Sequence, residues 1–297
     1  GEDGMRTKAV GTGAFMMKPV KEGEAVIMDR NPDYWATDAD GNQLPYLDAV
    51  RFSFIKEKKQ ELLEFKKGNI DMLYRIPTEN IQDILGDLDK AKEENKPFEL
   101  QISPFMSTFY YGFLHPVKPF DDKRVRLAFN HAIDRKKIVD YTLKGEGIPA
   151  TYGIVPPATN FESKGYNFKG LKGYTYDPDL AKKLLAEAGF PNGKNFPHLT
   201  LQINSGGGDR NVMTAQVIQS MLKENLNIAI SIETLPFAQS LDKIESGQTL
   251  FWRSGWVADY PDPETFLTLL YSAHIPPNLP VSSYVNSFRF KSAKYYS

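Results

Sequence analysis

The fold is decided by residues 198–254, which read HLTLQINSGGGDRNVMTAQVIQSMLKENLNIAISIETLPFAQSLDKIESGQTLFWRS. Alternating apolar and β-branched residues predict three strands, at Leu199–Ile203, Ile228–Glu233 and Leu250–Trp256. Apolar residues at helical spacing predict a helix in each interval, at Asn211–Leu226 and Pro236–Glu245. Strands that alternate with helices form parallel sheets with right-handed crossovers. This stretch therefore predicts a βαβαβ unit in residues 198–254.

The sequence upstream of this unit predicts shorter elements. We expect strands at 25–28 and 50–55, a helix at 58–67 and an aromatic strand, STFYYGFL, at 107–114. A longer helix is predicted from Asp121 or Asp122 through Leu143, because its apolar residues form one broad face. The fold class is therefore α/β.

Composition excludes several kinds of protein. The chain has 297 residues, 41% of them apolar, so it can bury a substantial core. Its 36 Lys and Arg residues balance 37 Asp and Glu residues, for a net charge of −1. A chain this close to neutral lacks the excess of basic residues that is typical of nucleic-acid-binding proteins. No apolar run reaches the length of a membrane-spanning helix. The absence of cysteine rules out disulfides, thiolate metal sites and cysteine nucleophiles.

The opening residues, GEDGMRTKAVGTGAF, lack the apolar segment of a secretory signal. On this evidence the chain is either cytosolic or a mature or excised part of an exported protein.

Three motifs that could carry chemistry do not fit their patterns. The Gly-rich loop 205–209 lacks the phosphate-binding spacings, and we expect Asp209 to cap the following helix. The stretch 38–42 places its glycine fourth rather than sixth, which does not match a calcium loop. The four histidines are scattered, without metal-ligand spacing or the setting of a catalytic triad. We predict no cofactor and no metal site.

The segment 251–264, FWRSGWVADYPDPE, is the most informative for function. Asp262-Pro263 is explained as the start of a helix. Asp259 has no such duty, and it follows the carboxyl end of a predicted parallel strand, where open α/β sheets bind ligands. With Trp256 and Tyr260 beside it, this carboxylate is suited to hold a cation. The alternative is that Asp259 only shapes the turn before Tyr260-Pro261.

Four segments resemble the solute-binding proteins of peptide/nickel ABC transporters, extracellular solute-binding protein family 5. They are GTGAFMMKPVKEGEAVIMDRNPDYW (11–35), KPFDDKRVRLAFNHAIDRKKIVD (118–140), YDPDLAKKLLAEAGFPNG (176–193) and GWVADYPDPETFL (255–267). The resemblance implies two α/β lobes of the type II periplasmic-binding-protein class, built of mixed sheets with flanking helices, with the ligand enclosed between them. The strands at 107–114 and 250–256 would be the crossovers between the lobes.

On this resemblance we expect three parts. Residues 1–110 would belong to a partial first lobe, 111–250 would form the second lobe, and 251–297 would return through the hinge to the first lobe. Family members normally carry about 150 or more residues before the region of Gly11. We therefore expect a truncated member that lacks most of the first lobe and binds peptide weakly or not at all by itself.

The resemblance also implies a function. In peptide-binding members the Asp of the A-D-Y motif, Asp259 here, pairs with the ligand's α-ammonium, and Trp256 would line the pocket. Tyr260 and Tyr110 are further candidates for contact with the ligand. Dipeptide-specific relatives place an arginine near the position of Ser205 for the ligand carboxylate. Arg210 comes several residues later, so longer peptides are favoured over strict dipeptides.

The expected protein is a non-enzymatic, monomeric receptor that delivers peptides to the permease subunits of an ABC transporter. It would lie in the periplasm or at the cell surface, and a lipid anchor on the full-length parent stays open. Alternative solutes are an oligosaccharide, which could stack on Trp256 and Tyr260, or a metal complex, although nickel-binding relatives generally lack an acid at position 259. An enzyme that uses Asp259 and Glu264 as an acid/base pair is the remaining alternative.

Overall fold

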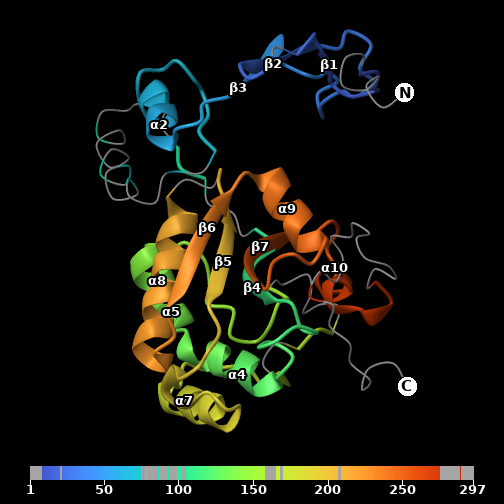
Figure 1. Ribbon diagram of the computed structural model, residues 1–297. Coiled ribbons are helices and arrows are strands. Elements are labelled where there is room, and N and C mark those ends of the chain that lie inside the picture. The colour runs from blue at the N-terminus through green and yellow to red at the C-terminus, as the bar shows by residue number, and fades with distance from the viewer. Residues whose placement is uncertain are drawn as a thin grey trace. The chain divides into compact units, whose positions relative to one another are not determined.

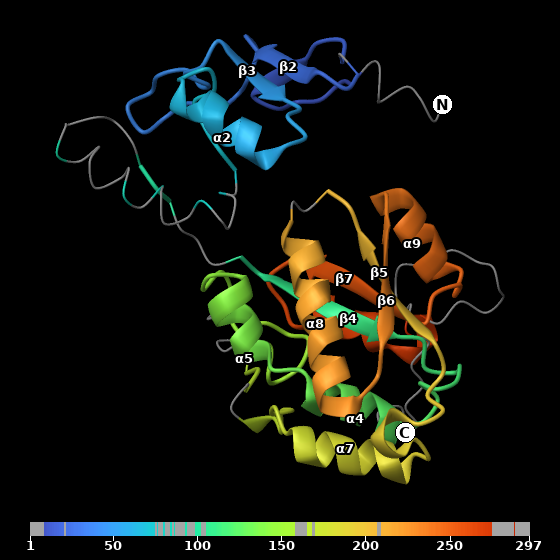
Figure 2. The ribbon, with the colours of Figure 1, turned by 60° about the vertical axis from the view of Figure 1, so that its left-hand side comes forward.

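The structure is a computed structural model. In it the chain forms two compact units, Gly1–Pro77 and Thr78–Ser297. The ribbon is shown in Figure 1 and, turned by 60°, in Figure 2. The structure describes residues 9–20, 22–74, 76, 80, 84, 86, 93, 99–101, 105–157, 165–167, 170–206, 209–274 and 288.

The first unit contains a small antiparallel sheet and one helix. The strands β1 (Phe15–Met17), β2 (Ala25–Arg30) and β3 (Ala49–Ser53) pair in chain order, and α2 (Lys58–Lys66) follows them. Strands β2 and β3 and helix α2 lie at the predicted places, within a few residues. Gly68 adopts a φ of +76°, a left-handed conformation that favours glycine and stops a helix.

The second unit is built on a mixed four-stranded sheet. Its strands are β4 (Ser107–Phe113), β5 (Leu199–Asn204), β6 (Ile230–Leu235) and β7 (Phe251–Val257), in the order β4-β7-β5-β6. Strand β5 runs parallel to β6 and to β7, whereas β4 is antiparallel to β7. The connections are α8 (Arg210–Leu226) and α9 (Phe237–Glu245). The βαβαβ unit and the α/β class are therefore confirmed.

Successive residues of each strand point to opposite faces of the sheet, and helices cover both faces. Leu201, Ile203 and Phe251 pack with α8, together with α4 (Lys123–Ala132) and α7 (Pro178–Glu187). On the other face Trp252 packs with Ile244 of α9. The two views agree that α8 and α9 lie on opposite sides of β5 and β6 (Figure 1, Figure 2). Burial of a leucine, isoleucine or phenylalanine side chain in this core stabilises the fold by roughly 1.5–3 kcal/mol relative to leaving it exposed.

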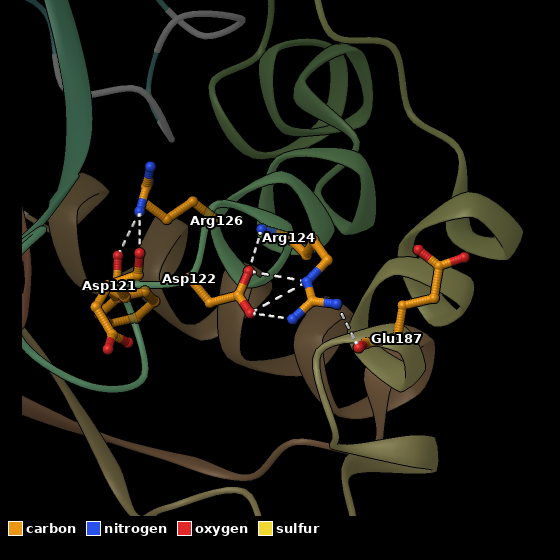
Figure 3. A network of polar contacts seen from close by, with 6 residues as sticks. Asp121, Asp122, Arg124, Arg126 and Glu187 are labelled. Carbon is orange, nitrogen blue, oxygen red and sulfur yellow. Dashed lines mark hydrogen bonds and ion pairs between the residues drawn. The ribbon is translucent and has the colours of Figure 1, made fainter. Parts of the chain in front are cut away.

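The start of α4 is fixed by a polar network (Figure 3). The Asp122 carboxylate accepts a hydrogen bond of 2.7 Å from the backbone N–H of Arg124, and Arg124 Nη2 donates to Asp122 Oδ2 at 2.6 Å. Arg124 Nη1 also donates to the carbonyl of Glu187 in α7, at 2.7 Å. Arg126 Nη1 donates to the carbonyls of Phe120 and Asp121. These bonds connect α4 to α7, and they satisfy backbone groups at the start of α4 and at the end of α7.

The single helix predicted through Leu143 is wrong. Helix α4 ends at Ala132, and Ile133 and Asp134 are extended before α5 (Arg135–Lys137) and the π-helix η2 (Ile138–Thr142). The cause is Asp134, whose carboxylate accepts a 2.9 Å bond from the Lys137 N–H and so starts a new helix.

Asp209 stands at the N-cap of α8, but its side chain makes no capping bond, because its backbone is already helical. The predicted cap is therefore wrong, and Gly207 and Gly208 of the same loop lie outside the described residues. The remaining short helices are η4 (Pro191–Gly193), α10 (Glu264–Leu267), η5 (Thr268–Leu270) and η6 (Ser272–His274). In the described residues, no helix has both the length and the apolar content needed to span a bilayer.

Candidate ligand-binding site

The candidate site begins where β7 ends. The Ala258 N–H donates to the carbonyl of Met106 at 2.9 Å, which keeps the chain beside the start of β4. The chain then turns, with the Asp262 N–H donating to the Tyr260 carbonyl at 2.8 Å. Asp262 Oδ1 accepts from the Glu264 N–H at 3.0 Å, just before α10, but the N-cap position of that helix is Pro263 rather than the predicted Asp262. The turn that carries Asp259 is thus anchored at both ends.

Asp259 is exposed at the surface of this turn. Its backbone N–H donates to Thr265 Oγ1 at 3.3 Å. Within the described part of the chain, its carboxylate accepts no hydrogen bond and forms no ion pair. The backbone at Asp259 is therefore fixed while its charge stays available for a cationic group.

Trp256 lies on β7, three positions before Asp259, and is partly buried. Its indole packs against the cluster of Val155 and Phe266, and its Nε1–H donates to Thr265 Oγ1 at 3.2 Å. Trp256 and Asp259 consequently share one hydrogen-bond acceptor. The role of the indole in ligand contact stays a prediction.

Tyr260 is 46% exposed, and its hydroxyl donates to Glu264 Oε2 at 3.4 Å. Partial desolvation, together with the negative charge of Glu264, raises the pKa of Tyr260. The phenol therefore stays protonated at neutral pH and keeps its donor. The structure places Trp256 near the end of β7, and Asp259 and Tyr260 on the turn that follows it.

Tyr110 lies on β4 opposite Ser254 of β7, on the same face of the sheet as Trp256. Its ring packs 5.4 Å from the ring of Phe288 and against the core cluster of Trp252. Burial raises the pKa of Tyr110, and a hydrogen bond with Ser254 opposes that shift. The contacts of this ring are those of a core residue, and its contact with the ligand stays a prediction.

Arg210 is not part of this group of residues. It is the first residue of α8, which packs against the opposite face of the sheet from Trp256. Its Nη1 donates to Glu146 Oε1 at 2.5 Å, so the guanidinium already neutralises a carboxylate. Binding of a ligand carboxylate by Arg210 stays a prediction.

Sequence reasoning missed Arg253. This residue of β7 lies with its Cζ 4.7 Å from the centroid of the Phe109 ring, a cation–π contact, and its Nη1 donates to Asn204 Oδ1 at 2.9 Å. Phe109 is 48% exposed, so a cation and an aromatic surface meet on the β4–β7 pair. The alternation of FWRSGWV, which puts Arg253 on the face of Phe251, was the signal that could have found it.

Thr265 was missed as well. It is only 1% exposed, and its hydroxyl accepts from both Trp256 and Asp259. In the sequence it looks like one polar residue in the first turn of an apolar helix, and nothing in that pattern marks it. Among the described residues, no group of three or more potential metal ligands is assembled.

A mixed α/β sheet covered on both faces, with an available carboxylate just past the end of a strand, is typical of a ligand-binding lobe. The sequence profile of the bacterial extracellular solute-binding proteins, family 5, matches residues 1–276. The chain belongs to this family, as its resemblance predicts. This is a family of solute-binding proteins and not of enzymes, so the acid/base pair of Asp259 and Glu264 is not supported.

Two comparisons show the extent of the match. The chain is 31% identical over 268 residues to the periplasmic oligopeptide-binding protein of Salmonella typhimurium, covering 89% of this chain and 46% of that protein. Among solved structures it is similar to the murein tripeptide-binding protein of Escherichia coli, with a TM-score of 0.77, 27% identity, and coverage of 99% of this chain and 53% of that one.

A third is the periplasmic protein DppA of Helicobacter pylori in complex with the peptide STSA, with a TM-score of 0.76 and 27% identity. The match covers 98% of this chain and 51% of that one. The chain thus spans about half the length of the relatives it matches. These likenesses place its fold among the periplasmic binding proteins.

Proposed function

We propose that this chain serves as the solute-capturing component of an ABC transporter, and that its solute is a peptide whose α-ammonium pairs with Asp259. The observation that carries the proposal is the Asp259 carboxylate, exposed and without a partner in the described residues, on a turn held by Thr265. The peptide-binding relatives support the same choice of solute. We propose oligopeptides rather than strict dipeptides, delivered outside the cytoplasm to a membrane permease.

The proposed mechanism has two steps. First, the peptide adds its extended main chain to the edge of the sheet near the β4–β7 pair, where β4 is the outermost strand, while Asp259 holds its amino end. Main-chain bonding is indifferent to side chains, so this step accepts varied peptides. Second, hinge rotation of two lobes encloses the ligand. Enclosure removes water from the ion pair and strengthens it.

The division into lobes is also a proposal: 1–110 as part of the first lobe, 111–250 as the second lobe, and 251–297 as the hinge return. Strand β4 leads into the second lobe and β7 leads out of it, and the seven paired positions from Ser107–Val257 to Phe113–Phe251 hold them together. Paired crossover strands are suited to act as the hinge, because both bend together.

Calorimetry on the complete natural polypeptide that contains residues 1–297 tests the proposal. The variants are Asp259→Asn, which removes one charge, and Asp242→Asn, a matched control on the exposed surface of α9. Removing one partner of a desolvated pair costs about 2–5 kcal/mol, or roughly 30- to several thousand-fold in Kd. We expect that loss for Asp259→Asn with a free-amine tetrapeptide, and none for the control.

Equal affinity of the wild type and Asp259→Asn would contradict the proposed ion pair. An oligosaccharide that binds the wild type and Asp259→Asn equally would instead favour stacking on the exposed Tyr260.

A further inference from the structure

Thr265 connects the two parts of the candidate site. Its hydroxyl oxygen accepts one hydrogen bond from the indole Nε1–H of Trp256, at 3.2 Å, and one from the backbone N–H of Asp259, at 3.3 Å. One donor comes from a side chain on β7 and the other from the backbone of the turn after it. A single oxygen therefore sets the position of the ring relative to the carboxylate-bearing residue.

This oxygen is itself held in a fixed place. Thr265 is 1% exposed, and the next residue, Phe266, is fully buried in the cluster with Val155. The Thr265 N–H donates to the Asp262 carbonyl at 3.3 Å, and Asp262 Oδ1 accepts from the Glu264 N–H. The start of α10 is thereby tied to the turn, so the acceptor does not move independently of the core. A β-branched threonine also has restricted χ1 freedom, which keeps Oγ1 aimed at its donors.

We propose that Thr265 is a positioning residue of the ligand site, which orients the Trp256 indole and the Asp259 carboxylate before the ligand arrives. The inference rests on the proposed function, because it concerns the same site. Its physical basis is that a preorganised site loses less freedom when the ligand binds. Without Oγ1, the partly buried indole N–H and the Asp259 N–H lose this acceptor, and a donor left without a partner away from water is costly. The ring and the turn then rearrange to reach water or another acceptor.

Two variants separate the hydroxyl from the shape of the side chain. Thr265→Val keeps the size and branching and removes the acceptor, whereas Thr265→Ser keeps the acceptor and removes a methyl group. Loss of such hydrogen bonds corresponds to about 10-fold weaker binding of a free-amine tetrapeptide. We expect that loss for Thr265→Val and rescue by Thr265→Ser to within about 3-fold.

A spectroscopic readout accompanies the titrations. In an NMR spectrum of the complete natural polypeptide, we expect the Trp256 indole proton to shift in Thr265→Val and to keep its wild-type position in Thr265→Ser. Slow exchange of that indole proton with solvent is expected in the wild type. Fast exchange in the wild type would overturn the inference without any variant, even if Thr265→Val failed to fold.

Asp259→Asn, measured in parallel, distinguishes the two claims. If it binds the peptide as the wild type does, the proposed ion pair is wrong, and the indole spectra still decide the role of Thr265. If Asp259→Asn binds weakly and Thr265→Val binds normally, the ion pair stands and the inference about Thr265 is wrong. Equal losses in Thr265→Val and Thr265→Ser would also overturn it, because the hydroxyl would then not be the determinant.

Discussion

Two glycines on the paired strands β4 and β7 allow a matched test of the packing. An alanine Cβ at Gly112 would lie 2.6 Å from Trp252 Cε2 and 2.7 Å from Phe288 Cε1. An alanine Cβ at Gly255 would lie equally close, 2.6 Å, to Cδ1 of the Phe109 ring. The two substitutions add the same methyl group at the same clash distance. They differ in the ring that must give way, because Trp252 is 1% exposed and Phe109 is 48% exposed.

The expected magnitudes follow from that difference. Overpacking an enclosed core costs roughly 1–3 kcal/mol, while alanine in place of glycine recovers about 0.4–1 kcal/mol by restricting the unfolded chain. Gly112→Ala should therefore lower the free energy of unfolding by about 1–2 kcal/mol, or roughly 2–8 °C in Tm. In Gly255→Ala the Phe109 ring can turn outward and lose its contact with Arg253, which costs about 0.5–1 kcal/mol. The gain from alanine offsets this cost, so the net change should be near zero.

Urea unfolding followed by circular dichroism at 25 °C measures both variants, and a thermal scan gives Tm. A stability loss in Gly112→Ala with little change in Gly255→Ala supports the packing described for this sheet. Equal losses, or a larger loss in Gly255→Ala, would refute it, since the exposed ring would then be as constrained as the buried one.

Three further results are expected. Asp122→Ala should lower the free energy of unfolding by about 1 kcal/mol in urea, because the cap of α4 is lost. The hydrogen bond from Arg124 lowers the pKa of Asp122. The stability difference between wild type and Asp122→Ala should therefore be full above about pH 4 and shrink as the pH falls below it. Burial, with help from the charge of Arg126, lowers the pKa of His115 to about 4, so NMR titration should show a neutral ring at pH 5.5. The unfolded chain binds this proton first, near pH 6.5, so stability should fall between pH 6.5 and 4, and less so in His115→Gln. Leu222→Ala should cost about 2–5 kcal/mol in urea unfolding, because its side chain is fully buried under the sheet, and a loss below 1 kcal/mol would contradict the core assignment.

The βαβαβ unit could be predicted because its signals are local and agree with one another. Leu199, Leu201 and Ile203 alternate along β5, and all three are buried against α8. The helix predicted through Leu143 failed for an equally local reason. Apolar periodicity continues past Ala132, but the capping preference of Asp134 prevails over it and divides the segment.

The candidate site was predictable only where its residues are neighbours in the sequence. Trp256, Asp259 and Tyr260 lie on one strand end and its turn, so their proximity could be inferred from the motif. The partner of Arg210 could not, because Glu146 is 64 residues away in the chain and meets it only through the fold. Thr265 could not be predicted for a different reason. Its role depends on the hydrogen bonds that its hydroxyl oxygen accepts from Trp256 and Asp259, and sequence spacing does not show which donors reach that oxygen.

The most direct test compares a free-amine tetrapeptide with its N-acetylated form, each titrated against the wild type and Asp259→Asn. Acetylation removes the ligand's positive charge and the substitution removes the protein's negative charge. If the two charges meet, acetylation should weaken binding strongly in the wild type and hardly at all in Asp259→Asn. An acetylation cost of the same size in both proteins would show that the α-ammonium is bound somewhere other than Asp259.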